Sequence, residues 1–217
     1  MNGDQVLVDN DVVFKLCAFG YHGVLVDGAV WAPASMLPFG KFVLRDLARK
    51  SRGVCNREGL TAAVEEVISG IEVMRPSGAA IELAADLEEA ANAKALELDA
   101  GESQLLAMLI LGEARLIITG DKRAVAAIEV LEPRRARQRI ASLEQLLVML
   151  LELGHFKDLR RGVCAEPQVD TATTACFACH SEQPARADIE AGLKSYIAVL
   201  KIIAPTVLCD RAELARL

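Results

Sequence analysis

The stretch that most constrains the fold lies between residues 98 and 124 and reads LDAGESQLLAMLILGEARLIITGDKRA. Its pattern predicts an apolar helix, then a short apolar strand over 116–119, then a second helix over 122–131. A short strand that is apolar at every position is typical of a parallel sheet covered on both faces by helices. Two acidic residues, Glu102 and Asp121, each stand at a helix start beside this strand.

Strand and helix patterns alternate over residues 5–153, which predicts a three-layer α/β/α domain with a parallel sheet. We expect the other strands at 5–8, 71–74 and 140–141, the last at an edge of the sheet. Residues 20–28 are expected to form a loop, and residues 31–38, with two prolines, an irregular entry into a helix over 39–50. The alternation predicts this domain at 1–154 and a mainly helical, cysteine-containing C-terminal extension at 155–217.

The composition indicates a cytoplasmic, soluble protein. Apolar residues make up 53% of the chain, enough for a sizeable core. A net charge of −6 argues against a broad nucleic-acid surface, although it leaves room for a local basic patch. We find no secretory signal and no apolar run of the roughly 20 residues that a membrane span needs. The six cysteines are therefore expected to be reduced thiols or metal ligands rather than disulfides.

Three acidic residues are predicted to meet at one edge of the sheet. Asp9 ends the apolar run 6–8, Asp121 follows the strand 116–119, and Glu102 begins the helix that leads into that strand. Ligands of open parallel sheets bind beyond the carboxyl ends of the strands. Carboxylates gathered there repel each other unless a cation neutralises them, and oxygen ligands suit Mg²⁺ or Mn²⁺.

Each of these acids also has a purely structural interpretation. Asp9 or Asn10 can cap the helix that follows, and Asp121 or Thr119 can cap the helix over 122–131. Asp99 and Glu102 have the spacing of a capping box. Caps alone do not explain why the acids recur at positions where strands end.

The motifs VLVDND, LDAGESQLLAMLI and LIITGDKRA, in this order over residues 5–153, resemble the PIN-domain nucleases. The resemblance implies a Mg²⁺- or Mn²⁺-dependent endoribonuclease with Asp9, Glu102 and Asp121 as metal-binding catalytic residues. It matches Thr119 to a small polar residue of the later turn, and Lys122 or Arg123 is expected to steady the phosphate. It also implies RNA as the substrate, and relatives often act as toxins held by a small antitoxin-like protein and often form homodimers.

Two positions depart from that family and support a different function. Many members carry a further Glu in the second helix, but here Pro33 is followed by ASMLPFG, and Asp46 lies further along. Position 122, often acidic in relatives, is Lys122. The alternative is a catalytically degenerate PIN-like protein that binds RNA or a partner without cutting it.

The C-terminal extension suggests a second metal site. Cys176 and Cys179 have the spacing of a zinc knuckle, and the candidate zinc ligands are Cys164, Cys176, Cys179, His180 and Cys209. Reduced thiols without metal explain this pattern equally well. Covalent haem attachment at CxxCH is not expected, because no export signal is seen. A further alternative is a zinc- or redox-sensing module in which these cysteines carry the function.

The connector EPRRARQR over 132–139 is the most basic short segment between the predicted elements. It is a candidate RNA-phosphate patch beside the acidic pocket, formed by Arg134, Arg135, Arg137 and Arg139. The alternative is a solvated connection between a helix and a strand.

Overall fold

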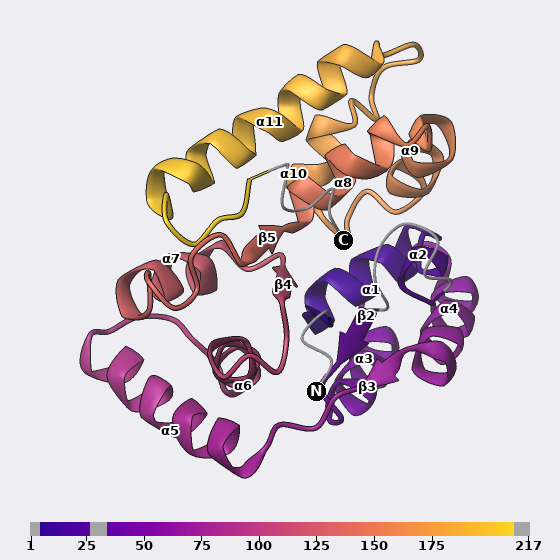
Figure 1. Ribbon diagram of the computed structural model, residues 1–217. Coiled ribbons are helices and arrows are strands. Elements are labelled where there is room, and N and C mark those ends of the chain that lie inside the picture. The colour runs from indigo at the N-terminus through magenta and orange to yellow at the C-terminus, as the bar shows by residue number, and fades with distance from the viewer. Residues whose placement is uncertain (1–4, 27–33, 211–217) are drawn as a thin grey trace.

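A five-stranded parallel sheet lies at the centre of the protein, as a computed structural model shows for residues 5–26 and 34–210 (Figure 1). The strand order is β3-β2-β1-β4-β5, and every pairing is parallel. The strands are β1 Val6–Val8, β2 Ala34–Met36, β3 Glu72–Val73, β4 Leu116–Thr119 and β5 Ile140–Ser142. The predicted α/β class and parallel sheet are confirmed, and β5 is an edge strand as expected.

Helices cover both faces of this sheet (Figure 1). One group packs on one face and consists of α1 Asn10–Ala18, α2 Gly23–Val26, α3 Gly40–Lys50 and α4 Arg57–Gly70. The other face is covered by α5 Gly78–Ala93, α6 Ala100–Ile110 and α7 Lys122–Leu131. The C-terminal part adds α8 Leu143–Glu152, α9 Phe156–Ala165, α10 Thr171–Cys176 and α11 Arg186–Ile203. Among the helices described, none is long and apolar enough to cross a membrane.

Successive residues of each strand point to opposite faces and so feed two separate cores. Val6, Val8 and Ile118 lie in the core shared with α1, α3 and α4. Leu7 and Ile117 lie in the core shared with α5, α6 and α7. This arrangement explains why the strands are apolar at every position rather than at every second one.

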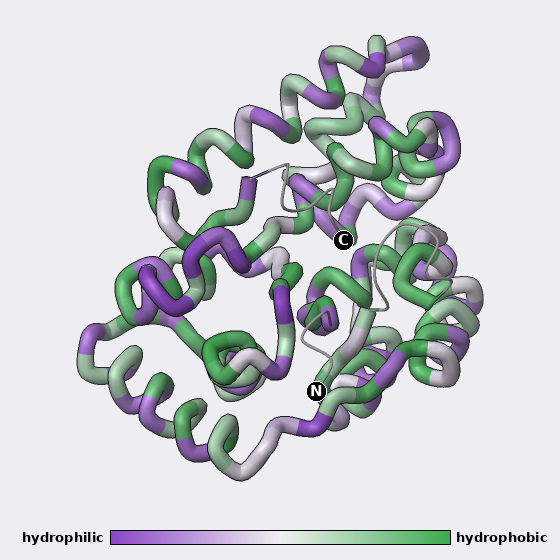
Figure 2. Tube along the Cα trace, viewed as in Figure 1, coloured by the Kyte–Doolittle hydropathy of each residue, from purple (hydrophilic) through white to green (hydrophobic). Residues whose placement is uncertain are grey.

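The helix α5 packs mainly on α6, with a narrow face of three alanines and one leucine. Its turns alternate between hydrophobic and hydrophilic in Figure 2. The buried positions are Ala80, Ala84, Leu87 and Ala91, whereas Ile81 is 56% exposed. The residues from 77 to 98, rich in Ala, Leu and Glu, predict a helix up to 98, whereas the helix ends at Ala93.

In the N-terminal part of the chain, the sequence analysis missed one strand and one short helix. β2 was expected to be irregular because Pro33 and Pro38 flank it, yet its three residues pair with β1 and β3 and are buried. A three-residue strand is too short to display a period that a sequence window detects. The expected loop over 20–28 contains α2, and the part of both segments over 27–33 lies outside the described residues.

The C-terminal region shares both cores with the sheet. Phe177 and Leu193 belong to the core under α1 and α8, and Leu200 to the core under α7. Leu208 bridges Ile140 in parallel, and the Cys209 N–H donates to the Ile140 carbonyl at 2.7 Å. The edge of β5 is therefore covered, which removes a strand edge that could pair with another chain.

Glu166 joins the C-terminal region to the start of α4. Its carboxylate is 3% exposed and accepts the N–H groups of Cys55 at 2.6 Å and Asn56 at 2.7 Å. We expect Glu166→Ala to lower the free energy of unfolding by about 2 kcal/mol, because the N–H groups of Cys55 and Asn56 lose a buried, charged acceptor. Urea unfolding measures this, with the exposed Glu182→Ala as control; equal stability of the two variants would contradict it.

Candidate functional site

Asp9 lies at the carboxyl end of β1, where its backbone is held against β4. Its N–H donates to the Ile118 carbonyl at 2.9 Å. Asp9 occupies the N-cap position of α1, but its side chain makes no capping hydrogen bond. The carboxylate instead accepts a hydrogen bond from the Thr119 hydroxyl at 3.1 Å. The capping interpretation is therefore wrong for this side chain, which faces the end of β4.

Thr119 connects Asp9 to Asp121. While its hydroxyl donates to Asp9, the same oxygen accepts the backbone N–H of Asp121 at 3.1 Å. Thr119 is 3% exposed, so this link lies under the surface at the end of β4. Two acids that are 112 positions apart in the chain are thus fixed on either side of one hydroxyl.

Asp121 is the N-cap of α7, as its capping interpretation predicts. Its Oδ1 accepts the N–H groups of Arg123 at 2.7 Å and Ala124 at 3.3 Å, and its Oδ2 lies 3.1 Å from the Arg123 guanidinium. Burial alone would raise the pKa of Asp121, but these hydrogen bonds outweigh burial and lower it. Asp121 therefore keeps its negative charge at neutral pH.

Glu102 forms the predicted capping box with Asp99 at the start of α6. Its Oε2 accepts the Asp99 N–H at 2.8 Å, and its own N–H donates to the Asp99 carboxylate at 2.8 Å. Burial raises the pKa of Glu102 to about 7, and the charges of Asp99, Asp121 and Asp9 add to the effect. Glu102 also lines the same small hollow as Thr119, which places it at the same edge as the other two acids.

Asp9 also has a perturbed pKa. Burial raises it to about 6, and the nearby charge of Asp11 contributes in the same direction. At this edge, burial thus disfavours the charged forms of Asp9 and Glu102. Raised pKa values of this kind are common at functional sites.

Two small hollows open beside these acids, each of about 10 Å³. The first is lined by Val8, Asp9, Asn10, Leu37, Gly101 and Leu105. The second is lined by Glu102, Leu105, Ile117, Thr119, Ala124 and Ile128. Each hollow has room for about one water molecule.

The carboxylates are neighbours without forming a closed ligand cage. Within residues 5–26 and 34–210, no three histidine, cysteine or acidic side chains are close enough to hold a metal ion. Glu102 and Asp121 are turned toward the backbone N–H groups of their own helix starts. Asp46 does not join the site, because its carboxylate pairs with Arg49 and Lys50 on the outside of α3, each at 2.7 Å.

Two of the basic residues predicted to assist, Lys122 and Arg139, contact other parts of the protein, whereas Arg123 pairs with Asp121 at the site. The Lys122 ammonium lies 2.8 Å from Glu144 and 4.3 Å from the centre of the Tyr196 ring. The connector over 132–139 leads into the amino end of β5, and the guanidinium of Arg139 donates to backbone carbonyls of Ala114 and Arg115 just before β4. Because the strands are parallel, this is the edge opposite the acids. The expected position of the connector beside the acidic pocket is therefore wrong.

The expectation of reduced cysteines is wrong for two of them, because Cys164 and Cys179 form a disulfide. In this state neither sulfur is a thiolate that can bind zinc. Of the other candidate zinc ligands, Cys176 and Cys209 are buried and His180 is exposed. Burial raises the pKa of the Cys176 thiol, and Glu144 adds to this.

The sequence analysis missed a series of ion pairs that connects the C-terminal region to the acidic edge. Lys15 lies 2.8 Å from Asp11 and 2.8 Å from Asp170, the N-cap of α10. Burial alone would lower the pKa of Lys15, but these two acids raise it. The spacing of Asp11 and Lys15 hinted at a helix pair, whereas no sequence signal marked Asp170.

Comparisons of the chain with models of protein families, with curated proteins and with solved structures found no match.

Proposed function

We propose that this protein is a Mg²⁺- or Mn²⁺-dependent endoribonuclease of the PIN-like type, with Asp9, Glu102 and Asp121 as its catalytic residues. The observation that carries the proposal is the Thr119 hydroxyl, which joins Asp9 to Asp121 at the carboxyl ends of β1 and β4. The order of the three resembling motifs along the chain supports it. An antitoxin-like inhibitor and a second copy of the chain stay predictions of the resemblance.

The donor set suits a hard divalent cation. It consists of carboxylate oxygens, and the raised pKa values of Asp9 and Glu102 indicate uncompensated negative charge that a cation would relieve. Asp9 makes no capping bond, so its carboxylate can bind a cation without weakening α1. Glu102 and Asp121 would have to exchange one hydrogen bond at a helix start for a cation contact. A bound cation would supply activation of water and neutralisation of phosphate charge.

The three acids would then have different roles. Asp9 and Asp121 would hold the cation directly, Asp121 being the acid whose lowered pKa keeps it ionised. Glu102 has a pKa of about 7 and is oriented by the Asp99 N–H, so it can hold the cation or accept a proton from the attacking water. Thr119 would position Asp9 through its hydroxyl.

A second candidate function is binding of RNA without cleavage. It is favoured by the capping bonds of Glu102 and Asp121 and by the outward ion pairs of Asp46, which leave the start of α3 without an acid at the edge. The two functions differ in one respect that can be measured, which is hydrolysis that depends on a divalent cation.

The test is cleavage of a labelled RNA by the purified full chain, with Mn²⁺ or with EDTA. We expect Mn²⁺ to produce fragments with 5′-phosphate and 3′-hydroxyl ends, and EDTA to abolish them. Mn²⁺ and RNA without protein form the control for spontaneous hydrolysis. RNA that is bound but stays intact in Mn²⁺ would overturn the nuclease proposal and support the second function.

A further inference from the structure

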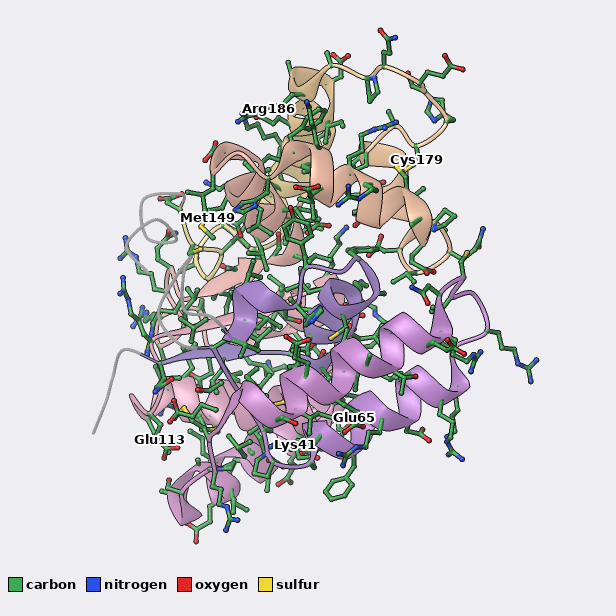
Figure 3. All side chains as sticks on the ribbon, turned by 90° about the vertical axis from the view of Figure 1, so that its right-hand side faces the viewer. Lys41, Glu65, Glu113, Met149, Cys179 and Arg186 are labelled. Atoms are coloured by element: carbon green, nitrogen blue, oxygen red, sulfur yellow. A yellow bond between two sulfur atoms is a disulfide. The ribbon has the colours of Figure 1, made fainter. Side chains whose placement is uncertain are left out.

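The helices α3 and α4 carry a concentration of positive charge in an otherwise acidic chain. Residues 40–58 contain six basic and two acidic side chains, whereas the whole chain has a net charge of −6. We call the surface formed by the basic residues, together with Phe42, the α3–α4 basic face. Its basic residues are Lys41, Arg45, Arg49, Lys50, Arg52 and Arg57. Figure 3 looks onto this side of the molecule, with Lys41 on α3 and Glu65 on α4 labelled.

A groove of about 400 Å³ runs between the two helices on this face. It is lined by Arg45, Ala48, Arg49, Arg57, Thr61, Val64 and Glu65. Three guanidinium groups thus border it together with one carboxylate. Guanidinium groups present several donors in a fixed plane, which suits the oxygens of a phosphate.

The arginine side chains of the groove are held in place by their neighbours. Arg45 makes two hydrogen bonds of 2.7 Å each to Glu65. Arg57 donates to the backbone carbonyls of Arg49 and Ser51. These acceptors are neutral, so the two hydrogen bonds hold the guanidinium in place without neutralising its charge. Ordered side chains lose less conformational freedom when they bind a ligand.

Aromatic side chains accompany the charges. Phe42 is 72% exposed on α3, one turn from Arg45, and Phe39 just before the helix is 36% exposed. A phenylalanine that is mostly in water has no role in the core of this fold. Bases of a single strand stack on exposed aromatic rings while cationic side chains follow the backbone.

The α3–α4 basic face begins at the acidic edge. Gly40 lies so close to Asn10, the neighbour of Asp9, that a Cβ would overlap the Asn10 Oδ1. A Cβ on Gly101, next to Glu102, would lie 3.3 Å from the Phe39 ring. From there α3 extends for 11 residues, roughly 16 Å, along the molecule.

We propose that the α3–α4 basic face is the track along which single-stranded RNA reaches the acidic edge. Phe42 would stack on a base, and Arg49 and Arg57 would contact phosphates in the groove. This inference rests on the proposed function for the role of the edge, but binding can be measured separately from cleavage. An acidic protein segment would match the charges, but it would leave Phe42 and the continuity with the edge unexplained.

Binding is tested on the full chain in EDTA, by fluorescence anisotropy with a labelled 12-nucleotide single-stranded RNA. We expect Arg49→Glu to weaken binding roughly tenfold and to make the salt slope shallower by about 0.7, the effect of one phosphate contact. The matched control is Arg161→Glu on α9. Arg161 is 79% exposed and paired with Asp158 three residues away, as Arg49 is 74% exposed and paired with Asp46.

Phe42→Ala is expected to weaken RNA binding about fivefold or more through loss of stacking. Ile202→Ala is the control, because Ile202 is 81% exposed on α11. Urea unfolding of all four variants checks that they fold. Absence of RNA binding by the unaltered chain, or equal affinities of variants and controls, would overturn the track. Displacement of the RNA by polyglutamate as efficiently as by unlabelled RNA would also overturn it.

The outcomes separate this inference from the proposed function. If Mn²⁺-dependent cleavage occurs while Arg49→Glu and Phe42→Ala bind like their controls, the nuclease stands and the track is wrong. If no cleavage occurs while both variants lose RNA binding, the track stands and the second, non-cleaving function is supported.

Discussion

Replacing Asp9 with Asn is expected to reduce Mn²⁺-dependent RNA cleavage at least about 100-fold. The amide keeps the shape of the carboxylate and an oxygen that accepts the Thr119 hydroxyl hydrogen bond, but it removes the charge that a cation needs. The matched control is Asp46→Asn, which removes an exposed carboxylate on the outside of α3. Undiminished cleavage by Asp9→Asn, or equal loss in Asp46→Asn, would contradict the assignment.

The same variant is expected to be more stable than the natural chain at alkaline pH. The pKa of Asp9 is about 6 in the folded state and 3.8 without burial, so the folded state binds this proton more tightly. Below about pH 4, Asp9 is protonated in both the folded and the unfolded state, and its contribution to the free energy of unfolding is fully present. This contribution is lost as pH rises through 6. Because Asp9 keeps partial contact with solvent, we expect Asp9→Asn to gain about 2 kcal/mol at pH 8.

Unfolding of both proteins in urea at pH 8 and pH 4 measures this gain. The difference between them should be present at pH 8 and absent at pH 4. A destabilised Asp9→Asn at pH 8 would show that the carboxylate has a structural role instead. Lower activity together with higher stability is the expected combination for a residue that serves a site rather than the fold.

Loss of the disulfide between Cys164 and Cys179 is expected to lower the free energy of unfolding by about 3 kcal/mol. The bond closes a loop with a sequence separation of 15. This loop carries Glu166, which holds the start of α4, and Asp170, which holds Lys15 near the acidic edge. Without the disulfide this loop would unfold more often, and the contacts of Glu166 and Asp170 would then be lost together.

The variant that tests this replaces both Cys164 and Cys179 with Ser, with Cys55→Ser as the control at an exposed cysteine. Urea unfolding with and without dithiothreitol should show that the reductant destabilises the natural chain and Cys55→Ser, but has no effect on the double variant. Equal midpoints for all three proteins in both conditions would contradict a stabilising bond.

The elements that the sequence predicted well are those with strong local signals. The helix over 122–131 and the capping box of Asp99 and Glu102 depend on side chains within one or two turns, and both are found as predicted. β2 was missed because a three-residue strand between prolines obtains its stability from pairing with β1 and β3. Neither partner is near it in the sequence.

The gathering of three acids at one edge of the sheet was predictable from topology. Asp9 and Asp121 follow the carboxyl ends of β1 and β4, which meet at a common edge of a parallel sheet, and Glu102 lies at the start of α6, the helix that leads into β4. The partners of the basic residues were not predictable, since Lys122 meets Glu144 and Tyr196 only after α8 and α11 have packed. The disulfide was missed because its two sulfurs become neighbours through the folding of α9 and α10.

The most direct test of the central claim is binding of Mn²⁺ to the full chain, followed by the paramagnetic resonance signal of free Mn²⁺. We predict that the natural chain and Asp46→Asn remove one equivalent of Mn²⁺ from solution, and that Asp9→Asn and Asp121→Asn do not. Equal binding by all four proteins, or binding by none of them, would contradict a divalent-cation site formed by Asp9, Glu102 and Asp121.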